Sequence, residues 1–178
     1  MTIVKTLPQF LSAPGAASRR AALACLGAWG AGLCLSASRG VALAAGELVR
    51  WPSVRLMDGR RWAPEAGRAQ LLVFWSVSCP FCQRHNAHVQ KLQDKVLAEG
   101  GLQILTVSRD RDPAAVARYL AAQRYSFAVT FEHEALRKAL AARAVVPLTV
   151  LVDRRGRILQ SIPGEMFEDD LMELQHLG

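Results

Sequence analysis

Cys79 and Cys82 are the residues whose types and spacing most directly predict chemistry. They enclose Pro80 and Phe81 in a C-P-F-C motif, and two sulfurs three positions apart can close a small disulfide ring. The motif follows an apolar run, Leu71–Trp75, and precedes a helical pattern. At the first turn of a helix, unpaired N–H groups and the positive end of the dipole favour a thiolate at the leading cysteine. This arrangement is typical of dithiol redox sites.

The position of each cysteine relative to the helix predicts its role. Cys79 lies nearer the helix start, so we expect it to be the more exposed and more acidic thiol, and the attacking nucleophile. Cys82 lies one turn deeper and should resolve the mixed disulfide, which releases the partner. Pro80 suits the first turn because its missing N–H would have no intrahelical partner. Phe81 offers an apolar surface on which a partner can dock.

Two alternatives place a metal ion at the same residues. A structural zinc site needs a second pair of ligands, but no cysteine follows Cys82. The spacing C-x-x-C-x-x-H-x-x-H, which ends in His85 and His88, would instead suit Cu(I) in a copper chaperone. On a helix His88 lies about half a circumference from Cys79, so only Cys79, Cys82 and His85 could share one ion. We expect no cofactor and no metal, and keep the copper chaperone as the alternative.

Residues 1–44 differ in composition from the rest of the chain. They contain four basic residues and no acidic residue, and an apolar segment, Ala21 to Ala37, follows the pair Arg19-Arg20. Ala42-Leu43-Ala44 offers small residues for cleavage, as in a secretory signal, and the paired arginines resemble a twin-arginine export signal. An uncleaved membrane anchor is the alternative, although the apolar segment is short for a hydrocarbon core of about 30 Å. We favour cleavage, which leaves residues 45–178 as one exported domain.

The net charge and the cysteine content of residues 45–178 exclude further classes of function. Four of the 22 basic residues lie in 1–44, so 18 remain against 15 acidic residues, a net charge of +3 instead of +7. Basic and acidic residues alternate around 109–112, which is typical of a solvated face, and we predict no nucleic-acid binding. Cys25 and Cys34 would leave with the signal. A bridge across two residues hardly constrains the unfolded chain, so the remaining pair is expected to serve chemistry.

The hydrophobic pattern of residues 45–178 predicts alternating strands and helices. The predicted strands cover residues 48–51, 53–57, 60–62, 71–75, 102–107, 127–130, 148–152 and 156–162. The predicted helices cover residues 83–98, 113–124, 132–143 and 167–177. After an N-terminal β-hairpin that turns at Asp58-Gly59, the order is βαβαβαββα. This is an α/β sheet that ends in an antiparallel hairpin.

Two stretches carry a resemblance to a known family. Phe74-Trp75, followed by three residues and the C-P-F-C motif, resembles the active-site strand and turn of the thioredoxin fold. The stretch 145–153 resembles the one in which that family has a cis proline beside the active-site disulfide. The resemblance implies a cis bond at Pro147, and a backbone at Val146 that pairs with a substrate segment as an extra strand. From the residues alone, Pro147 also fits an ordinary proline at the start of a strand.

The spacing between the two stretches indicates which group within that family the chain resembles. Pro147 lies 65 positions after Cys82, and the surplus over a minimal thioredoxin predicts a strand–helix insertion within 102–131. With the export signal and the hairpin, residues 47–177 are similar to the TlpA/ResA group of periplasmic thioredoxin-like proteins. This resemblance implies a thiol–disulfide oxidoreductase, usually a reductant that a membrane electron carrier supplies. Its partners would be cysteine-containing periplasmic proteins in cytochrome or copper-protein assembly. The sequence leaves reductant and oxidant both open.

Three positions depart from these relatives. Ser78 precedes Cys79, where most relatives have Trp, and Val73 replaces the buried Asp that cytoplasmic thioredoxins use as a proton acceptor. His85 replaces a Glu that TlpA/ResA relatives often carry. Histidine titrates near neutral pH, and His85 lies one turn beyond Cys82, so we expect it to carry the proton of that thiol. The alternative interpretation of His85 is a surface residue of the helix.

Overall fold

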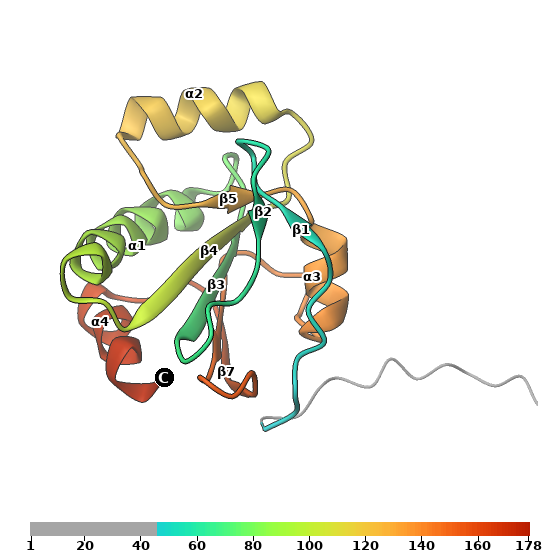
Figure 1. Ribbon diagram of the computed structural model, residues 1–178. Helices are drawn as coiled ribbons and strands as arrows, with labels where there is room; N and C mark the ends of the chain where they lie inside the picture. The colour runs from blue at the N-terminus through green and yellow to red at the C-terminus, as the bar shows by residue number, and fades with distance from the viewer. Residues whose placement is uncertain (1–45) are drawn as a thin grey trace, which may run out of the picture. The chain divides into compact units, whose positions relative to one another are not determined.

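A computed structural model describes residues 46–178, in which strands and helices alternate (Figure 1). The strands are β1 (Val54–Arg55), β2 (Arg61–Trp62), β3 (Ala69–Trp75), β4 (Leu102–Ser108), β5 (Val129–Thr130), β6 (Leu148–Val152) and β7 (Ile158–Pro163). The helices are α1 (Pro80–Glu99), α2 (Pro113–Gln123), α3 (His133–Ala139) and α4 (Glu168–Leu177). The predicted export signal at 1–44 lies outside the described residues. Within 46–178, none of the helices combines the length and the apolar character that a membrane crossing requires.

Five strands form the main sheet in the order β5-β4-β3-β6-β7, while β1 and β2 form a separate antiparallel hairpin. β3 is parallel to β4, and β4 to β5, whereas β6 runs antiparallel to both β3 and β7. After the hairpin, the chain order is therefore βαβαβαββα, which confirms the predicted α/β architecture. α2 and β5 lie within 102–131, where the sequence predicts an inserted helix and strand.

The segment before the hairpin is not the strand that the pattern predicts at 48–51. Only Leu48 forms a β-bridge, an isolated antiparallel one with Arg157. The backbone N–H of Val49 also donates to the carbonyl of Gly156 at 2.8 Å. The segment therefore touches the turn before β7 at a few positions without forming a ladder, and its buried Val49 packs in the core cluster that contains Val150 and Ile158.

The predicted helix at 132–143 is shorter in the structure, because α3 ends at Ala139. Ala141 has a positive φ of 43°, which the backbone of a helix cannot have. The N–H of Ala142 turns back to the carbonyl of Arg137 at 2.9 Å and closes the helix end. A residue with a Cβ atom rarely adopts this conformation, so the sequence pattern carries no sign of the stop.

β3 is buried along its whole length and divides the core into two parts. Leu71, Val73 and Trp75 pack with residues of α1, α2 and α4, whereas Leu72 and Phe74 pack with residues of α3 and the hairpin. Figure 1 shows α1 and α4 on one side of the sheet and α3 on the other. A strand covered on both faces needs a continuous apolar sequence. This packing fixes the carboxyl end of β3, from which the C-P-F-C motif departs.

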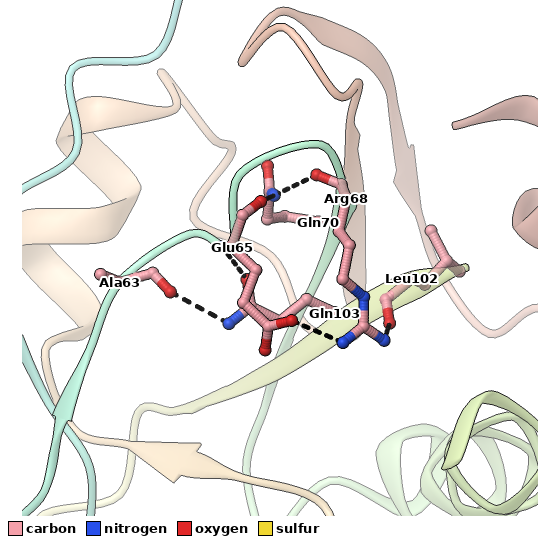
Figure 2. Close-up of polar contacts among 6 residues, drawn as sticks. All are labelled: Ala63, Glu65, Arg68, Gln70, Leu102 and Gln103. Carbon is pink, nitrogen blue, oxygen red and sulfur yellow. Dashed lines mark hydrogen bonds and ion pairs between the residues drawn. The ribbon is translucent and has the colours of Figure 1, made fainter. Parts of the chain in front are cut away.

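A polar network between the β2–β3 connection and β4 stabilises the opposite end of the sheet. Figure 2 shows the Arg68 guanidinium donating to the Glu65 carboxylate at 2.6 Å and to the carbonyl of Leu102 at 2.5 Å. The Gln103 side chain accepts from the N–H of Glu65 at 2.9 Å and donates to the carbonyl of Ala63 at 3.0 Å. These contacts hold the amino ends of β3 and β4 together, so the two strands reach their carboxyl ends in register.

Candidate active site

Cys79 is the N-cap of α1, and Pro80 is the first residue of the helix, as the sequence predicts. The backbone of Cys79 is extended (φ −95°, ψ 111°), and its Sγ accepts the N–H of Cys82 at 3.2 Å. The sulfur therefore occupies the position that an oxygen has at most helix starts. The first turn of α1 holds no acidic residue that would compete for the dipole. The free N–H groups of the helix terminus are thus directed at this sulfur.

Cys82 is buried, whereas Cys79 is partly exposed. Burial raises the pKa of Cys82 to about 12, and its hydrogen bond with Cys79 acts in the same direction. At neutral pH Cys82 is therefore a protonated thiol inside the core, one helical turn from a sulfur that solvent can reach. This difference in exposure is the one that the expected roles of nucleophile and resolving thiol require.

The loop before β6 lies against the exposed sulfur. The Val146–Pro147 peptide bond is cis, as the resemblance implies. The carbonyl oxygen of Val146 lies 3.8 Å from Cys79 Sγ. Pro147 is buried, Val146 is half-buried and Val145 is exposed. The structure thus places the backbone of Val146 beside the sulfur that a partner would meet first.

His85 differs from both interpretations of the sequence. It is fully buried in α1, so it is not a surface residue. Its Nδ1 accepts the N–H of Met166 at 3.2 Å, which leaves the proton on Nε2, 3.1 Å from the hydroxyl of Thr149. Burial lowers the pKa of His85 to about 4. The expectation that His85 titrates near neutral pH and carries the proton of Cys82 is therefore wrong.

The reason is tertiary packing that the helix pattern does not reveal. β6 and the segment between β7 and α4 cover the face of α1 on which His85 lies, and both ring nitrogens meet partners there. Thr149 lies in β6, two residues after Pro147, which immediately precedes that strand. His85 thus links α1 to the strand that follows the cis proline, which is a positioning contact.

The sequence analysis missed Asp110, which lies just after β4. Its Oδ1 accepts the hydroxyl of Ser76 at 2.8 Å, and its Oδ2 accepts the N–H of Val77 at 3.0 Å and the hydroxyl of Ser108 at 2.8 Å. The expectation of a solvated face around 109–112 is wrong for this residue. Asp110 could have been predicted from its position after a strand parallel to β3, because the carboxyl ends of parallel strands meet at one edge of the sheet.

Phe81 is the most prominent apolar group beside the sulfurs, with 58% of its surface exposed. The guanidinium of Arg84 lies 5.0 Å from the centroid of its ring. Arg84 in turn forms a bidentate pair with Glu165, at 2.6 to 3.0 Å. This pair lowers the pKa of the Glu165 carboxyl. An exposed aromatic ring is thus held in place next to the motif.

The residues of the copper alternative do not form a ligand set. Both ring nitrogens of His85 are engaged with Thr149 and Met166. His88 points to Glu168, at 3.6 Å. Among residues 46–178, no three His, Cys, Asp or Glu side chains gather as metal ligands. The geometry favours redox chemistry of the two sulfurs over metal transport.

Comparison with known proteins agrees with this geometry. Residues 58–175 match the family model of the thioredoxin-like domain. The chain belongs to this thioredoxin-like family. It is 27% identical over 113 residues to the thiol-disulfide oxidoreductase ResA of Halalkalibacterium halodurans, a match that covers 62% of each chain. The chain thus spans about three-fifths of the length of this curated relative.

Solved structures show that the thioredoxin-like fold extends over most of the chain. StoA from Bacillus subtilis superimposes with a TM-score of 0.60 at 21% identity, over 75% of this chain and 98% of StoA. A putative thiol:disulfide interchange protein DsbE from Chlorobium tepidum gives a TM-score of 0.64 at 24% identity, over 76% and 96% of the two chains. The predicted similarity of this thioredoxin-like protein to the ResA group is confirmed.

Proposed function

We propose that this thioredoxin-like protein is a thiol–disulfide oxidoreductase that exchanges its C-P-F-C dithiol with disulfides of partner proteins. One observation carries the proposal: a partly exposed Cys79 caps α1 directly above the buried thiol of Cys82. The match to relatives named ResA thiol-disulfide oxidoreductase supports it. The copper chaperone has no comparable support, because its ligands are not gathered.

The two sulfurs divide the reaction between them. The Cys79 thiolate attacks one sulfur of a partner disulfide, which forms a mixed disulfide and releases the other partner sulfur as a thiolate that takes up a proton. Cys82 then loses its proton and attacks Cys79 Sγ, which closes the internal disulfide and frees the second partner thiol. The partner gains two electrons, and the protein is oxidised.

The partner segment is held by the surface around Cys79. The backbone of Val146 would pair with an extended segment of the partner, next to Pro147. The exposed ring of Phe81 would cover apolar side chains on the other side of the sulfur. Both groups lie beside Cys79, so a disulfide bound between them meets the nucleophile.

The composition of residues 1–44 supports an exported setting for the domain. The basic and apolar segment within 1–44 would direct export, with cleavage after Ala44, so the domain 45–178 would act in the periplasm. There it would reduce cysteine-containing proteins, those of cytochrome or copper-protein assembly included. A membrane dithiol protein would then have to return two electrons to the oxidised Cys79–Cys82 pair. If the segment stays uncleaved, the protein is anchored in the inner membrane.

Equilibration with glutathione or a dithiol buffer tests the direction of exchange. The fraction of the Cys79–Cys82 disulfide, measured at defined buffer potentials, gives the reduction potential. We expect a value near that of thioredoxin, about −270 mV, for a reductant. A potential near −120 mV, the range of DsbA-type oxidants, would make the protein a donor of disulfides and overturn the reductant role. The absence of any internal disulfide under oxidising buffers would overturn the function altogether.

A further inference from the structure

The proposed exchange requires a group that controls the proton of Cys82. Burial raises the pKa of this thiol to about 12, yet it must deprotonate to resolve the mixed disulfide. Val73 supplies no carboxylate from β3, and His85 is neutral, with both nitrogens engaged. Neither residue therefore places a charge near the sulfur of Cys82.

Among the described residues, three titratable groups face Cys82 from the elements packed around it. Cys79 contacts it from the same turn, the phenol of Tyr119 in α2 interacts with it electrostatically, and the Asp110 carboxylate, in the loop after β4, adds a smaller electrostatic effect that raises its pKa. Burial raises the pKa of Tyr119 to about 12, so this phenol is neutral at physiological pH. Asp110 is therefore the carboxylate that acts on the resolving thiol.

Asp110 is bound to the turn that carries the cysteines. Its two oxygens accept three hydrogen bonds, two of them from Ser76 Oγ and Val77 N in that turn. Ser76 is buried, and its hydroxyl also lies 3.0 Å from that of Ser78. The backbone of Ser76 acts on both cysteines: its carbonyl accepts the N–H of Cys79 at 3.2 Å, and its backbone lowers the pKa of the Cys82 thiol, against the effect of burial.

We propose that Asp110 is a positioning residue for the dithiol, which fixes the turn Ser76–Ser78 and sets the protonation of Cys82. Its negative charge disfavours a second negative charge on Cys82. Burial already keeps this thiol protonated in the reduced protein, the charge of Asp110 adds to that effect, and Cys79 is the sulfur that attacks. The inference rests on the proposed function, because it names a group that keeps the resolving thiol of that exchange protonated.

The test measures the acidity of Cys82 directly. In the full chain, Cys25 and Cys34 are replaced by alanine and Cys79 by serine, which leaves Cys82 as the one thiol. Its alkylation by iodoacetamide is followed by mass spectrometry of the peptide between pH 7 and 10. With Asp110→Asn, we expect the alkylation rate at a given pH to rise about five- to tenfold, because the thiolate is no longer repelled.

Asp112→Asn is the matched control. Asp112 lies two residues away on the same loop, but its carboxylate caps α2 through the N–H of Ala114, at 2.9 Å, and faces Arg118. We expect its substitution to leave the pH profile of Cys82 unchanged. A profile for Asp110→Asn that coincides with the parent, or an equal shift in Asp112→Asn, overturns the proposal.

A second variant covers the case in which Asp110→Asn does not fold. Circular dichroism would then show the loss of structure, and Cys82 would react as a free thiol with a pKa of about 8.5. Asp110→Glu retains the charge: a folded protein with the parent profile supports the proposal, and one with a profile shifted to lower pH overturns it. Alkylation needs no partner protein, so a protein that reduces no partner would overturn the proposed function without touching this result.

Discussion

At the scale of single residues, the two cysteines differ by environment more than by chemistry. Cys79 caps a helix and meets solvent, while Cys82 lies in the core, with its pKa raised by burial to about 12. The same side chain is thus open to solvent in one position and enclosed by the core in the other. Burial is the main cause of this difference, and Cys79, Ser76 and Asp110 are the neighbouring groups that act on the Cys82 thiol.

The division of roles predicts opposite behaviour for two serine variants. Cys79→Ser should abolish reduction of a protein disulfide such as that of insulin, and should trap no partner, because the attacking sulfur is gone. Cys82→Ser should still attack and should accumulate mixed disulfides, since nothing resolves them. Non-reducing gel electrophoresis measures the trapped species. If Cys79→Ser captures partners and Cys82→Ser does not, the roles are reversed.

The burial of His85 predicts the pH dependence of its variant. Because its pKa is about 4, the imidazole is neutral from pH 6 to pH 8 and gains no proton from Cys82 there. Stopped-flow resolution rates of His85→Gln should therefore follow the same pH profile as those of the parent, even if their absolute size changes. A profile in the parent that bends near pH 6.5 and is straight in the variant would restore the proton-carrier role.

At the scale of elements, the start of α1 is the part of the structure that presents the site. It carries the N-cap sulfur, the exposed ring of Phe81 and the Arg84–Glu165 pair, which fixes the ring against the helix. Arg84 is more than half exposed, so its ion pair contributes little to stability. The pair instead holds the exposed ring of Phe81, on which a partner is proposed to dock, in a fixed position.

Phe81→Ala should lower kcat/KM for a protein disulfide about tenfold, because exposed aromatic anchors carry much of the binding energy at interfaces. Reduction of a small disulfide such as oxidised glutathione should hardly change. Leu97→Ala is the matched control, since Leu97 lies on the same helix and is 70% exposed, about 24 Å along the axis. Equal losses for both substrates would assign Phe81 to the chemistry of Cys79 instead of to docking.

At the scale of the whole molecule, the neutral buried histidine couples folding to pH. The folded pKa of His85 is about 4, below the 6.5 of an exposed histidine, so the unfolded chain binds the proton more tightly. The stabilisation is fully present above pH 6.5 and is lost as the pH falls toward 4. The size of the shift corresponds to about 3 kcal/mol.

Urea unfolding of the parent and of His85→Gln between pH 7.5 and pH 4 measures this coupling. The free energy of unfolding of the parent should fall by about 3 kcal/mol more than that of the variant over this range. The carboxylates with lowered pKa, Glu165 among them, titrate in both proteins, so the difference isolates the histidine. Parallel curves for the two proteins would contradict the neutral buried state.

Local chemistry in the sequence predicted the cysteine pair proposed for redox chemistry, and it determined the fold class. A C-x-x-C after an apolar run predicts sulfurs at a helix start, because the run must be a buried strand and proline favours the first helical turn. The order of strands and helices follows from the same periodicity. Pro147 was placed by its resemblance to a known motif, and the structure has it cis beside the sulfur.

Only the tertiary structure decided what surrounds the sulfurs. Asp110 reaches Ser76 across 34 positions, and His85 reaches Thr149 and Met166 across 64 and 81 positions. Residues so far apart meet because parallel strands end at one edge of the sheet and helices fold back over it. The pattern around His85 predicts a helix but not what covers its face, and the charges around Asp110 predict a solvated loop but not its bonds. The protonation of Cys82 therefore depends on contacts that the fold alone creates.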